Sequence, residues 1–557
     1  MCTLRATSQP PPPPHPLSHH THPVPLPGKR YFTWDKTYFP EPAALINDVA
    51  AHGRKVVTIV DPHVKRDDAY PIYADAHKAG HFVKTATGAE FDGWCWPGAS
   101  SYLDVTSRAV REWWASKFSL DQYSGSTPDL YIWNDMNEPS VFNGPEITMP
   151  KDCVHAGGWE HRDVHNAFGA AYHAATAAGL AARGRKALGT DGDRPFVLSR
   201  AFFAGTQTVG PIWTGDNTAD WAHLRASLPM LMTLGLAGLP FSGADVGGFF
   251  GDPDAELLTR WYQVGAYYPF FRGHAHLDAA RREPWLAGEP HTSRIRDAIR
   301  TRYRLLPYVY TLFRAANTTG APVLRPTWYD CPAAEAALAL DDQFMLGPAL
   351  LVAPILAPQA EGGGKRRAFL PPGAKWYDAA TGVHVTPRRD GWLDVAAGPE
   401  DIPAWWRGGS VIPLRERARR SSAAATRDPL TLVVALDADG RACGDLFLDD
   451  GKSYAFQRGV YVHRRFCFSK GVLASSAELV PDGAVPGKRF ATDIVVGRVV
   501  ILGLPKRKLW KASVGGVEVE AAPGPLFLRR GAPVSAVVVR KPDLPVADDW
   551  ELCVEAA

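Results

Sequence analysis

Long apolar runs, regularly spaced cysteines and clustered charge are all scarce in this chain. No stretch approaches the roughly 18 apolar residues of a membrane-spanning helix, so no membrane span is predicted. The seven cysteines are widely spaced, odd in number and without a Cys-x-x-Cys pair, which excludes a disulfide scaffold and the common zinc motifs. The 61 Lys and Arg nearly balance the 58 Asp and Glu and are dispersed, which argues against nucleic acid or an anionic membrane as the main partner.

The chain has 557 residues, which is enough for two or three domains with ample core. Residues 1–28 are rich in proline and histidine and carry no apolar segment typical of a secretory signal, so we expect a disordered leader there. The 18 Trp and 18 Tyr favour a flat ligand such as a sugar, although aromatic side chains also fill cores.

From residue 29 the chain alternates apolar runs with helical patterns, and most of the runs end in a polar side chain. This pattern predicts a (β/α)8 TIM-type barrel with its site at the carboxyl ends of the strands. A doubly wound sheet is the alternative, but no Gly-rich phosphate turn follows a first strand. Helices are expected at 107–118, 165–185, 218–236, 254–265 and 293–314, and strands at 54–61, 81–85, 130–134, 194–200, 211–215, 239–245 and 267–276.

Seven strand candidates are one fewer than the barrel needs, so we expect a barrel that lacks its first strand. Beyond about residue 325, short alternating strands with Gly and Pro turns predict C-terminal β-sandwich domains. The strands are expected at 349–355, 410–414, 430–436, 444–448 and 461–468, and loops or boundaries at 359–367 and 416–427. The expected domains are 29–330 (catalytic barrel), 331–425 (proximal sandwich) and 426–557 (distal sandwich).

Two carboxylates, Asp135 and Glu138, directly follow the apolar run 130–133. A strand that delivers acids into a loop beside Trp133 suits a sugar, whose C–H faces stack on rings while its hydroxyls need acceptors. The alternative is that the acids only cap the next helix.

Glycoside hydrolysis needs a second carboxyl group across the scissile bond. Asp216 is a candidate, because the apolar neighbour Trp213 favours a raised carboxyl pKa, although Asp and Asn also populate ordinary turns. Arg200 ends another strand, where it either orients a carboxylate or is an ordinary surface residue. Metal ligation by His274 and His276 lacks a companion carboxylate, so we expect no metal there.

Several motifs resemble family 31 of the glycoside hydrolases. The similarity runs from about residue 29 to the C-terminus. The motifs that carry it lie at 133–140, 213–217, 241–249 and 270–276, with further ones at 30–35, 59–63, 93–98, 142–146, 157–166, 341–344, 447–451 and 539–542.

The resemblance implies a role for each matching residue. Asp135 corresponds to the nucleophile of a retaining mechanism and Asp216 to the general acid/base, while Glu138 supports the nucleophile loop. Asp61, Arg200, Asp245 and His274 correspond to residues that bind glucose hydroxyls. The aromatic walls of the glucose pocket correspond to Trp96, Trp133, Trp213 and Phe249, and the surrounding shell corresponds to Met136 and Arg272.

The members that this chain most resembles remove α-1,3-linked glucose from N-glycans in the endoplasmic-reticulum lumen, and the resemblance implies that substrate and compartment. It also implies a β subunit as partner and no cofactor. The family has an N-terminal β-sandwich and a first barrel strand that this sequence lacks, so we expect a truncated chain. Three interpretations remain: an α-glucosidase chain, an inactive glycan-binding remnant, or a family member with another α-glycoside specificity.

Overall fold

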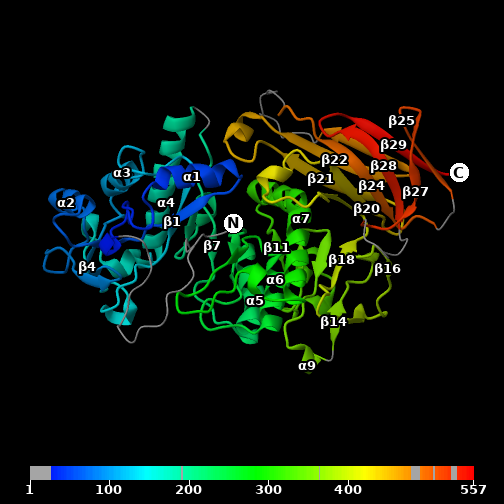
Figure 1. The fold of residues 1–557 in the computed structure, drawn as a ribbon. Coiled ribbons are helices and arrows are strands. Elements are labelled where there is room, and N and C mark those ends of the chain that lie inside the picture. The colour runs from blue at the N-terminus through cyan, green and yellow to red at the C-terminus, as the bar shows by residue number, and fades with distance from the viewer. Residues whose placement is uncertain (1–26, 190–191, 363, 478–489, 506–508, 528–535) are drawn as a thin grey trace. The chain divides into compact units, whose positions relative to one another are not determined.

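The computed structural model describes residues 27–189, 192–362, 364–477, 490–505, 509–527 and 536–557 (Figure 1). The chain divides into two compact units, one of residues 1–215 with 276–278 and one of residues 216–275 with 279–557. Each unit is described by itself. The expected leader at 1–28 lies, except for its last two residues, outside the described part.

The first unit is built on a parallel sheet. Its strands run in the order β1 (Val56–Ile59), β5 (Leu130–Asn134), β6 (Val197–Ser199) and β7 (Ile212–Trp213). All four were predicted, and the sequence expectation was at most three residues too long at each end. Because the strands are parallel and in register, their carboxyl ends meet at one edge of the sheet.

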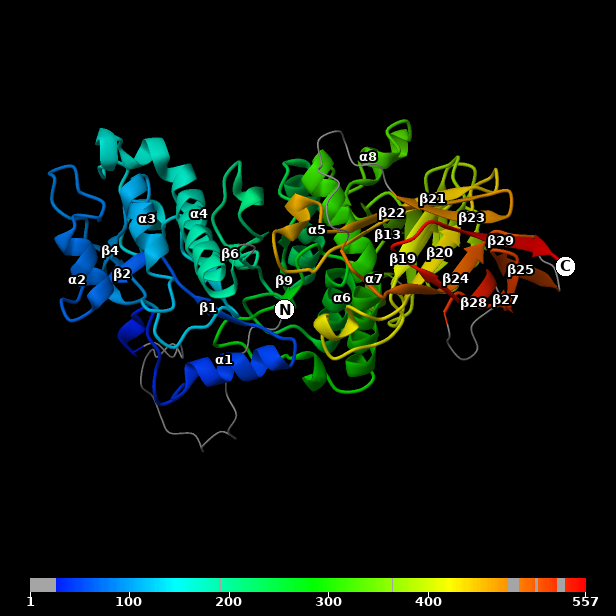
Figure 2. The same ribbon diagram turned by 90° about the horizontal axis from the view of Figure 1, so that it is seen from above.

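Helices accompany this sheet and contribute to the apolar core of the unit. They are α1 (Pro42–Ala51), α2 (Pro71–Lys78), α3 (Arg108–Ser116) and α4 (His161–Leu188), of which α3 and α4 lie side by side (Figure 2). Helices α1 and α4 contact the sheet itself. The fully buried Trp114 of α3 donates its indole N–H to Thr176 of α4 at 3.0 Å. Reciprocal hydrogen bonds between Glu160 and Asp163 form a capping box that begins α4.

The segment 81–85, expected as a barrel strand, is not one. It makes only isolated bridges, from Phe82 to Leu103 and from Lys84 to Glu90 and Val154. It lies beside a small antiparallel sheet of β2 (His63–Lys65), β4 (Gly98–Tyr102) and β3 (Gly93–Cys95). Its apolar side chains Phe82 and Val83 are buried in loop packing, which imitates the pattern of a short strand.

The second unit begins with three helices around very short strands. Asp220 and Asp254 accept backbone N–H groups at 2.7 Å and so begin α5 (Trp221–Leu236) and α6 (Ala255–Gly265), and the left-handed Gly320 ends α7 (His291–Thr319). The strands are β8 (Ser242–Gly243), β9 (Asp245–Val246) and β10 (Arg272–Gly273), and β9 and β10 pair in parallel.

Two β modules follow these helices in the second unit. The first is a sheet of β11 (Leu324–Arg325), β12 (Phe344–Leu346), β13 (Leu350–Val352), β18 (Ala404–Arg407), β15 (Trp376–Asp378) and β16 (His384–Val385). A two-stranded antiparallel sheet of β14 (Lys365–Phe369) and β17 (Trp392–Ala396) accompanies it, with the short helices α8 (Thr327–Asp330) and α9 (Gln359–Gly362). The expected loop at 359–367 is therefore wrong, because α9 and most of β14 occupy it.

The second module is one long mixed sheet, drawn in colours from yellow to red in Figure 1. Among the described residues its order is β26 (Val517–Val519), β25 (Trp510–Val514), β29 (Trp550–Ala556), β23 (Val472–Ala477), β22 (Val462–Ser469), β21 (Ala442–Leu448), β19 (Ser410–Leu414), β20 (Leu430–Ala435), β24 (Val495–Leu502), β28 (Ala536–Pro545) and β27 (Ala521–Gly524). β25 contacts β27, so the sheet curls around a shared apolar core. The domain boundaries expected near 330 and 425 stay predictions.

None of the helices in the described part of the chain combines the length and apolar character that crossing a bilayer requires.

Candidate active site

The first unit places several predicted site residues at the carboxyl edge of its parallel sheet. Ile59 of β1 lies opposite Trp133 of β5, and Asn134 lies opposite Ser199 of β6. Asp61, Asp135 and Arg200 therefore follow their strands at nearly the same level. The backbone N–H of Asp135 donates to Asp61 Oδ1 at 3.1 Å, which ties the two strand ends together.

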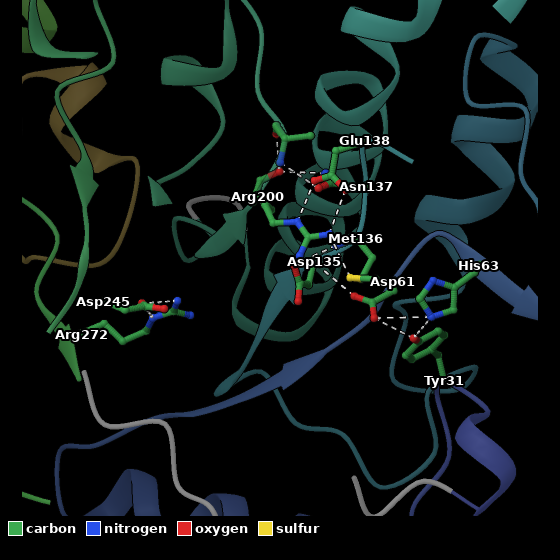
Figure 3. Close-up of polar contacts among 12 residues, drawn as sticks. Tyr31, Asp61, His63, Asp135, Met136, Asn137, Glu138, Arg200, Asp245 and Arg272 are labelled. Atoms are coloured by element: carbon green, nitrogen blue, oxygen red, sulfur yellow. Dashed lines mark hydrogen bonds and ion pairs between the residues drawn. The ribbon is translucent and has the colours of Figure 1, made fainter. Parts of the chain in front are cut away.

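Arg200 joins the side chains of the segment that follows β5 (Figure 3). Its guanidinium lies 3.0 Å from Asp135 Oδ1 and donates to both carboxylate oxygens of Glu138 at 2.7 and 2.9 Å. It also lies 2.9 Å from the sulfur of Met136, a buried residue with a left-handed φ of 56°. Glu138 and Arg200 together fix the loop that carries Asp135.

Asp61 lies in a buried polar cluster, with 1% of its surface exposed. Tyr31 donates its hydroxyl to Asp61 Oδ2 at 2.8 Å, and His63 Nε2 lies 2.6 Å from the same hydroxyl. Burial raises the pKa of Asp61 well above its ordinary value, and the neighbouring charge of Asp135 raises this pKa further. The hydrogen bond from Tyr31 opposes this shift.

Aromatic side chains accompany these polar groups. Trp133 and Trp213 meet edge to face with ring centroids 5.5 Å apart. Trp96, in the turn between β3 and β4, is 37% exposed and meets Phe142 edge to face at 4.8 Å. Phe142 lies in the motif at 142–146, one of those that carry the family resemblance. The resemblance implied no role for Phe142 in the aromatic walls of the pocket.

The second unit holds a buried ion pair. β9 and β10 place Asp245 opposite Arg272, whose Nε donates to Asp245 Oδ1 at 3.0 Å (Figure 3). Burial raises the pKa of Asp245 to about 6 and outweighs the opposing effect of Arg272. Asp245 Oδ2 is buried and has no hydrogen-bond partner among the described residues, as expected of an acceptor that awaits a ligand hydroxyl.

Asn217 organises the loop that carries Asp216. Its side chain donates to the Asp245 carbonyl at 3.1 Å and accepts the Phe249 N–H at 2.9 Å. The exposed Asp216 precedes it, and Phe249 packs against His274 with ring centroids 5.3 Å apart. Asn217 therefore ties Asp216 to the segment of Asp245 and Phe249.

The structure thus gathers the predicted site residues into two groups, one within each unit. The first holds Asp61, Trp133, Asp135, Met136, Glu138, Arg200 and Trp213, and the second holds Asp216, Asp245, Phe249, Arg272 and His274. Trp96 belongs to the first unit and packs on Phe142. The pairing of Asp135 with Asp216 across one sugar stays a prediction.

Sequence reasoning did not assign roles to Tyr31, His63, Phe142 or Asn217. His63 follows Asp61 by two residues and Asn217 follows Asp216 directly, so proximity to a candidate acid was the available signal. Among the described residues, no three His, Cys, Asp or Glu side chains are grouped so as to hold a metal ion.

Comparison with known proteins adds a family assignment. The family model described as "Glycosyl hydrolases family 31 TIM-barrel domain" matches residues 19–312, and that described as "Glycosyl hydrolase family 31 C-terminal domain" matches residues 320–412. The chain is 53% identical over 529 residues to a "Probable glucan 1,3-alpha-glucosidase" of Arabidopsis thaliana, covering 94% of this chain and 56% of that protein.

Two further relatives are also named as glucosidases. "Neutral alpha-glucosidase AB" of Homo sapiens is 48% identical over 528 residues, which cover 94% of this chain and 54% of that protein. A crystal structure of glucosidase II alpha subunit bound to alpha3-Glc2 superposes with a TM-score of 0.88 at 42% identity, covering 95% of this chain and 57% of that one. The chain therefore spans about half the length of the relatives that it matches.

Proposed function

Because the chain belongs to family 31 of the glycoside hydrolases, we propose that it is the catalytic part of a retaining exo-α-glucosidase. The observation that carries the proposal is the strand-end carboxylate Asp135, held by the Arg200 guanidinium at 3.0 Å and linked through its N–H to Asp61. A nucleophilic carboxylate needs such fixed orientation and charge compensation at the carboxyl edge of a barrel.

The proposed reaction has two steps. Asp135 attacks the anomeric carbon while Asp216 protonates the departing glycosidic oxygen, which gives a covalent glucosyl-enzyme. Asp216 then removes a proton from water, which displaces Asp135 and releases glucose with retained configuration. This mechanism requires the two carboxyl groups to lie about 5–5.5 Å apart.

The glucose pocket is proposed to hold its hydroxyls with Asp61, Arg200, Asp245 and His274. The buried, unpartnered Oδ2 of Asp245 supports such a role. Trp96, Trp133, Trp213 and Phe249 would form the aromatic walls, with Met136 and Arg272 behind them. Glu138 positions Arg200 rather than contacting the sugar.

The substrate is proposed to be terminal α-1,3-linked glucose on an N-glycan. This specificity rests on the relatives, one named a glucan 1,3-alpha-glucosidase and others crystallised with alpha3-Glc2 and Glc1Man2. A related structure is a heterodimer of the catalytic subunit and the binding domain of a regulatory subunit, which supports a β subunit as partner and the endoplasmic-reticulum lumen as compartment. The domain boundaries at 330 and 425 belong to the same proposal.

Covalent trapping of the nucleophile tests this function. Incubation with 5-fluoro-α-glucosyl fluoride should add one fluoroglucosyl group, and peptide mass spectrometry should place it on Asp135. Asp135→Asn should stay unlabelled. Label on another carboxylate, or none on the wild type under conditions that label a longer relative, would contradict the proposal.

A glycan-binding chain without hydrolysis is the second candidate, and a binding measurement separates it from the enzyme. Binding of a glucosylated glycan that survives Asp135→Ala, with no hydrolysis by the wild type, would favour it. Comparison of α-1,3- with α-1,4-linked glucosides would distinguish another specificity within the family.

A further inference from the structure

Asp61 is held by two hydrogen-bond donors from its own unit. Its Oδ1 accepts the Asp135 N–H at 3.1 Å, and its Oδ2 accepts the Tyr31 hydroxyl at 2.8 Å. A carboxylate offers about four acceptor positions, so capacity remains for ligand hydroxyls. All of this lies away from solvent, because Tyr31, Asp61 and His63 are each less than 5% exposed.

With Asp61 as a carboxylate, the hydrogen bonds of this cluster can run in only one direction. Tyr31 has one hydroxyl proton, and because Asp61 takes it, the contact with His63 Nε2 at 2.6 Å requires His63 to donate. His63 must therefore carry its proton on Nε2. His63 Nδ1 is buried without a partner among the described residues, as expected of the unprotonated nitrogen of that neutral tautomer.

We propose that Tyr31, oriented by His63, is a positioning residue that holds the Asp61 carboxylate as a fixed acceptor for a glucose hydroxyl. The identity of the sugar rests on the proposed function, whereas the hold of Tyr31 on Asp61 does not. The Asp135 N–H on the second oxygen of Asp61 couples this acceptor to the loop that carries the nucleophile.

The physical need for such a donor follows from burial. Desolvation and the charge of Asp135 favour the neutral form of Asp61, while the Tyr31 hydrogen bond and the charge of Arg200 favour the carboxylate. Burial lowers the pKa of His63 to about 3, so the donor to Tyr31 stays neutral. The remaining titratable groups that interact electrostatically with this cluster are Lys29, Cys95, Tyr102 and Tyr172.

The first measurement is calorimetric binding of a glucose-configured iminosugar to the full chain. Tyr31→Phe should weaken binding about tenfold, as expected for the loss of a hydrogen bond to a buried charge. His63→Ala should weaken it in the same direction, and His63→Gln, which restores an N–H donor, should recover part of the loss. Tyr123→Phe is the matched control, because this buried hydroxyl contacts Thr58 and not Asp61.

The second measurement needs no sugar. Tyr31→Phe raises the pKa of Asp61 further, and a raised folded pKa lowers stability as the pH rises through it. The stability gap between wild type and Tyr31→Phe should therefore be larger at about pH 8 than at about pH 4. The difference in stability between the wild type and Tyr123→Phe should be similar at both pH values.

The outcomes separate the two proposals. An equal Tyr31→Phe gap at both pH values overturns the hold of Tyr31 on Asp61. Unchanged iminosugar affinity in Tyr31→Phe, when Asp61→Asn abolishes binding, overturns its positioning role. A pH-dependent gap in a chain that binds no iminosugar leaves the hold of Tyr31 standing and refutes the proposed function.

Discussion

At the residue scale, Arg200 connects three side chains of the segment that follows β5. Asp135, Met136 and Glu138 all contact its guanidinium, and Glu138 does so through both carboxylate oxygens. The planar fork of arginine can satisfy a bidentate carboxylate and a second acid together, whereas the point charge of lysine cannot. The position of Asp135 therefore depends on this fork.

Arg200→Lys should lower kcat/KM by roughly 100-fold, or about 3 kcal/mol in transition-state stabilisation, because one ammonium cannot span both acids. Hydrolysis of a chromogenic α-glucoside measures the effect. The matched control is Arg465→Lys, since Arg465 also contacts both oxygens of an acid, Asp445, but lies in the C-terminal sheet. Equal activity of both variants would show that the fork is dispensable.

Asp245 gives a prediction about pH. Its folded pKa of about 6 lies above the ordinary 3.8, so its contribution to stability is full below about 3.8 and is lost as the pH rises through 6. This group alone should lower the free energy of unfolding by about 3 kcal/mol between about pH 4 and pH 8. The free energy of unfolding of Asp245→Asn, measured with urea, should not show this decrease between the two pH values.

Asp245→Asn also leaves the buried Arg272 guanidinium without the carboxylate that it contacts, which destabilises the variant. The stability of the variant should therefore be lower than that of the wild type but flatter against pH. A pH dependence identical to that of the wild type would show that Asp245 is not the titrating group.

At the scale of elements, the long periodic patterns predicted the structure best. The patterns at 107–118, 165–185, 218–236, 254–265 and 293–314 correspond to α3 to α7, because a buried apolar stripe over several turns has no other solution. Helix α1 was missed because it is only ten residues long and begins at a proline. So short a segment shows little helical periodicity in its apolar residues. The strand expected at 81–85 was wrong because loop residues can also be buried.

From the residues alone, the clearest site candidates were charged groups at strand ends, whereas the aromatic walls were implied by the family resemblance. Asp61, Asp135 and Arg200 follow strands and lie together in the structure, whereas Tyr31 and Phe142 reach this region through contacts with residues 30 and 46 positions away along the chain. Such long-range contacts leave no local signal in the sequence.

Substitution of Asn217 tests whether the loop after β7, which carries Asp216, depends on its hydrogen bonds to the segment of Asp245 and Phe249. Asn217→Ala leaves the Phe249 N–H and the Asp245 carbonyl without their partners, so it should cost about 1–3 kcal/mol of stability. It should also lower kcat/KM measured on the folded fraction, because the Asp216 loop loses its tie to Asp245.

Gln343 is the matched control for Asn217. Its side-chain amide also bridges backbone groups, accepting the Phe369 N–H at 2.9 Å and donating to the Phe369 carbonyl at 2.8 Å. Gln343→Ala should destabilise the protein similarly but leave kcat/KM of the folded fraction unchanged. Equal losses of activity in both variants would mean that Asn217 acts through stability alone.

At the scale of the whole molecule, the cysteines bear on where the protein folds. Cys443 of β21 and Cys467 of β22 are opposite each other and form a disulfide, whereas Cys95, Cys153, Cys331 and Cys553 are free. A disulfide of this kind persists in oxidising compartments and is rare where thiols are kept reduced. It is consistent with the lumenal location proposed above.

Non-reducing peptide mapping of the protein isolated from its own cells should recover residues 443 and 467 in one cross-linked peptide. The bond closes a loop of 24 residues, so replacing both cysteines by serine should lower the free energy of unfolding by about 3 kcal/mol. Cys553→Ser, at an exposed free cysteine in the same sheet, should change it little. A fully reduced pair in the isolated protein would contradict a lumenal location, because cross-strand cysteines in contact would oxidise there.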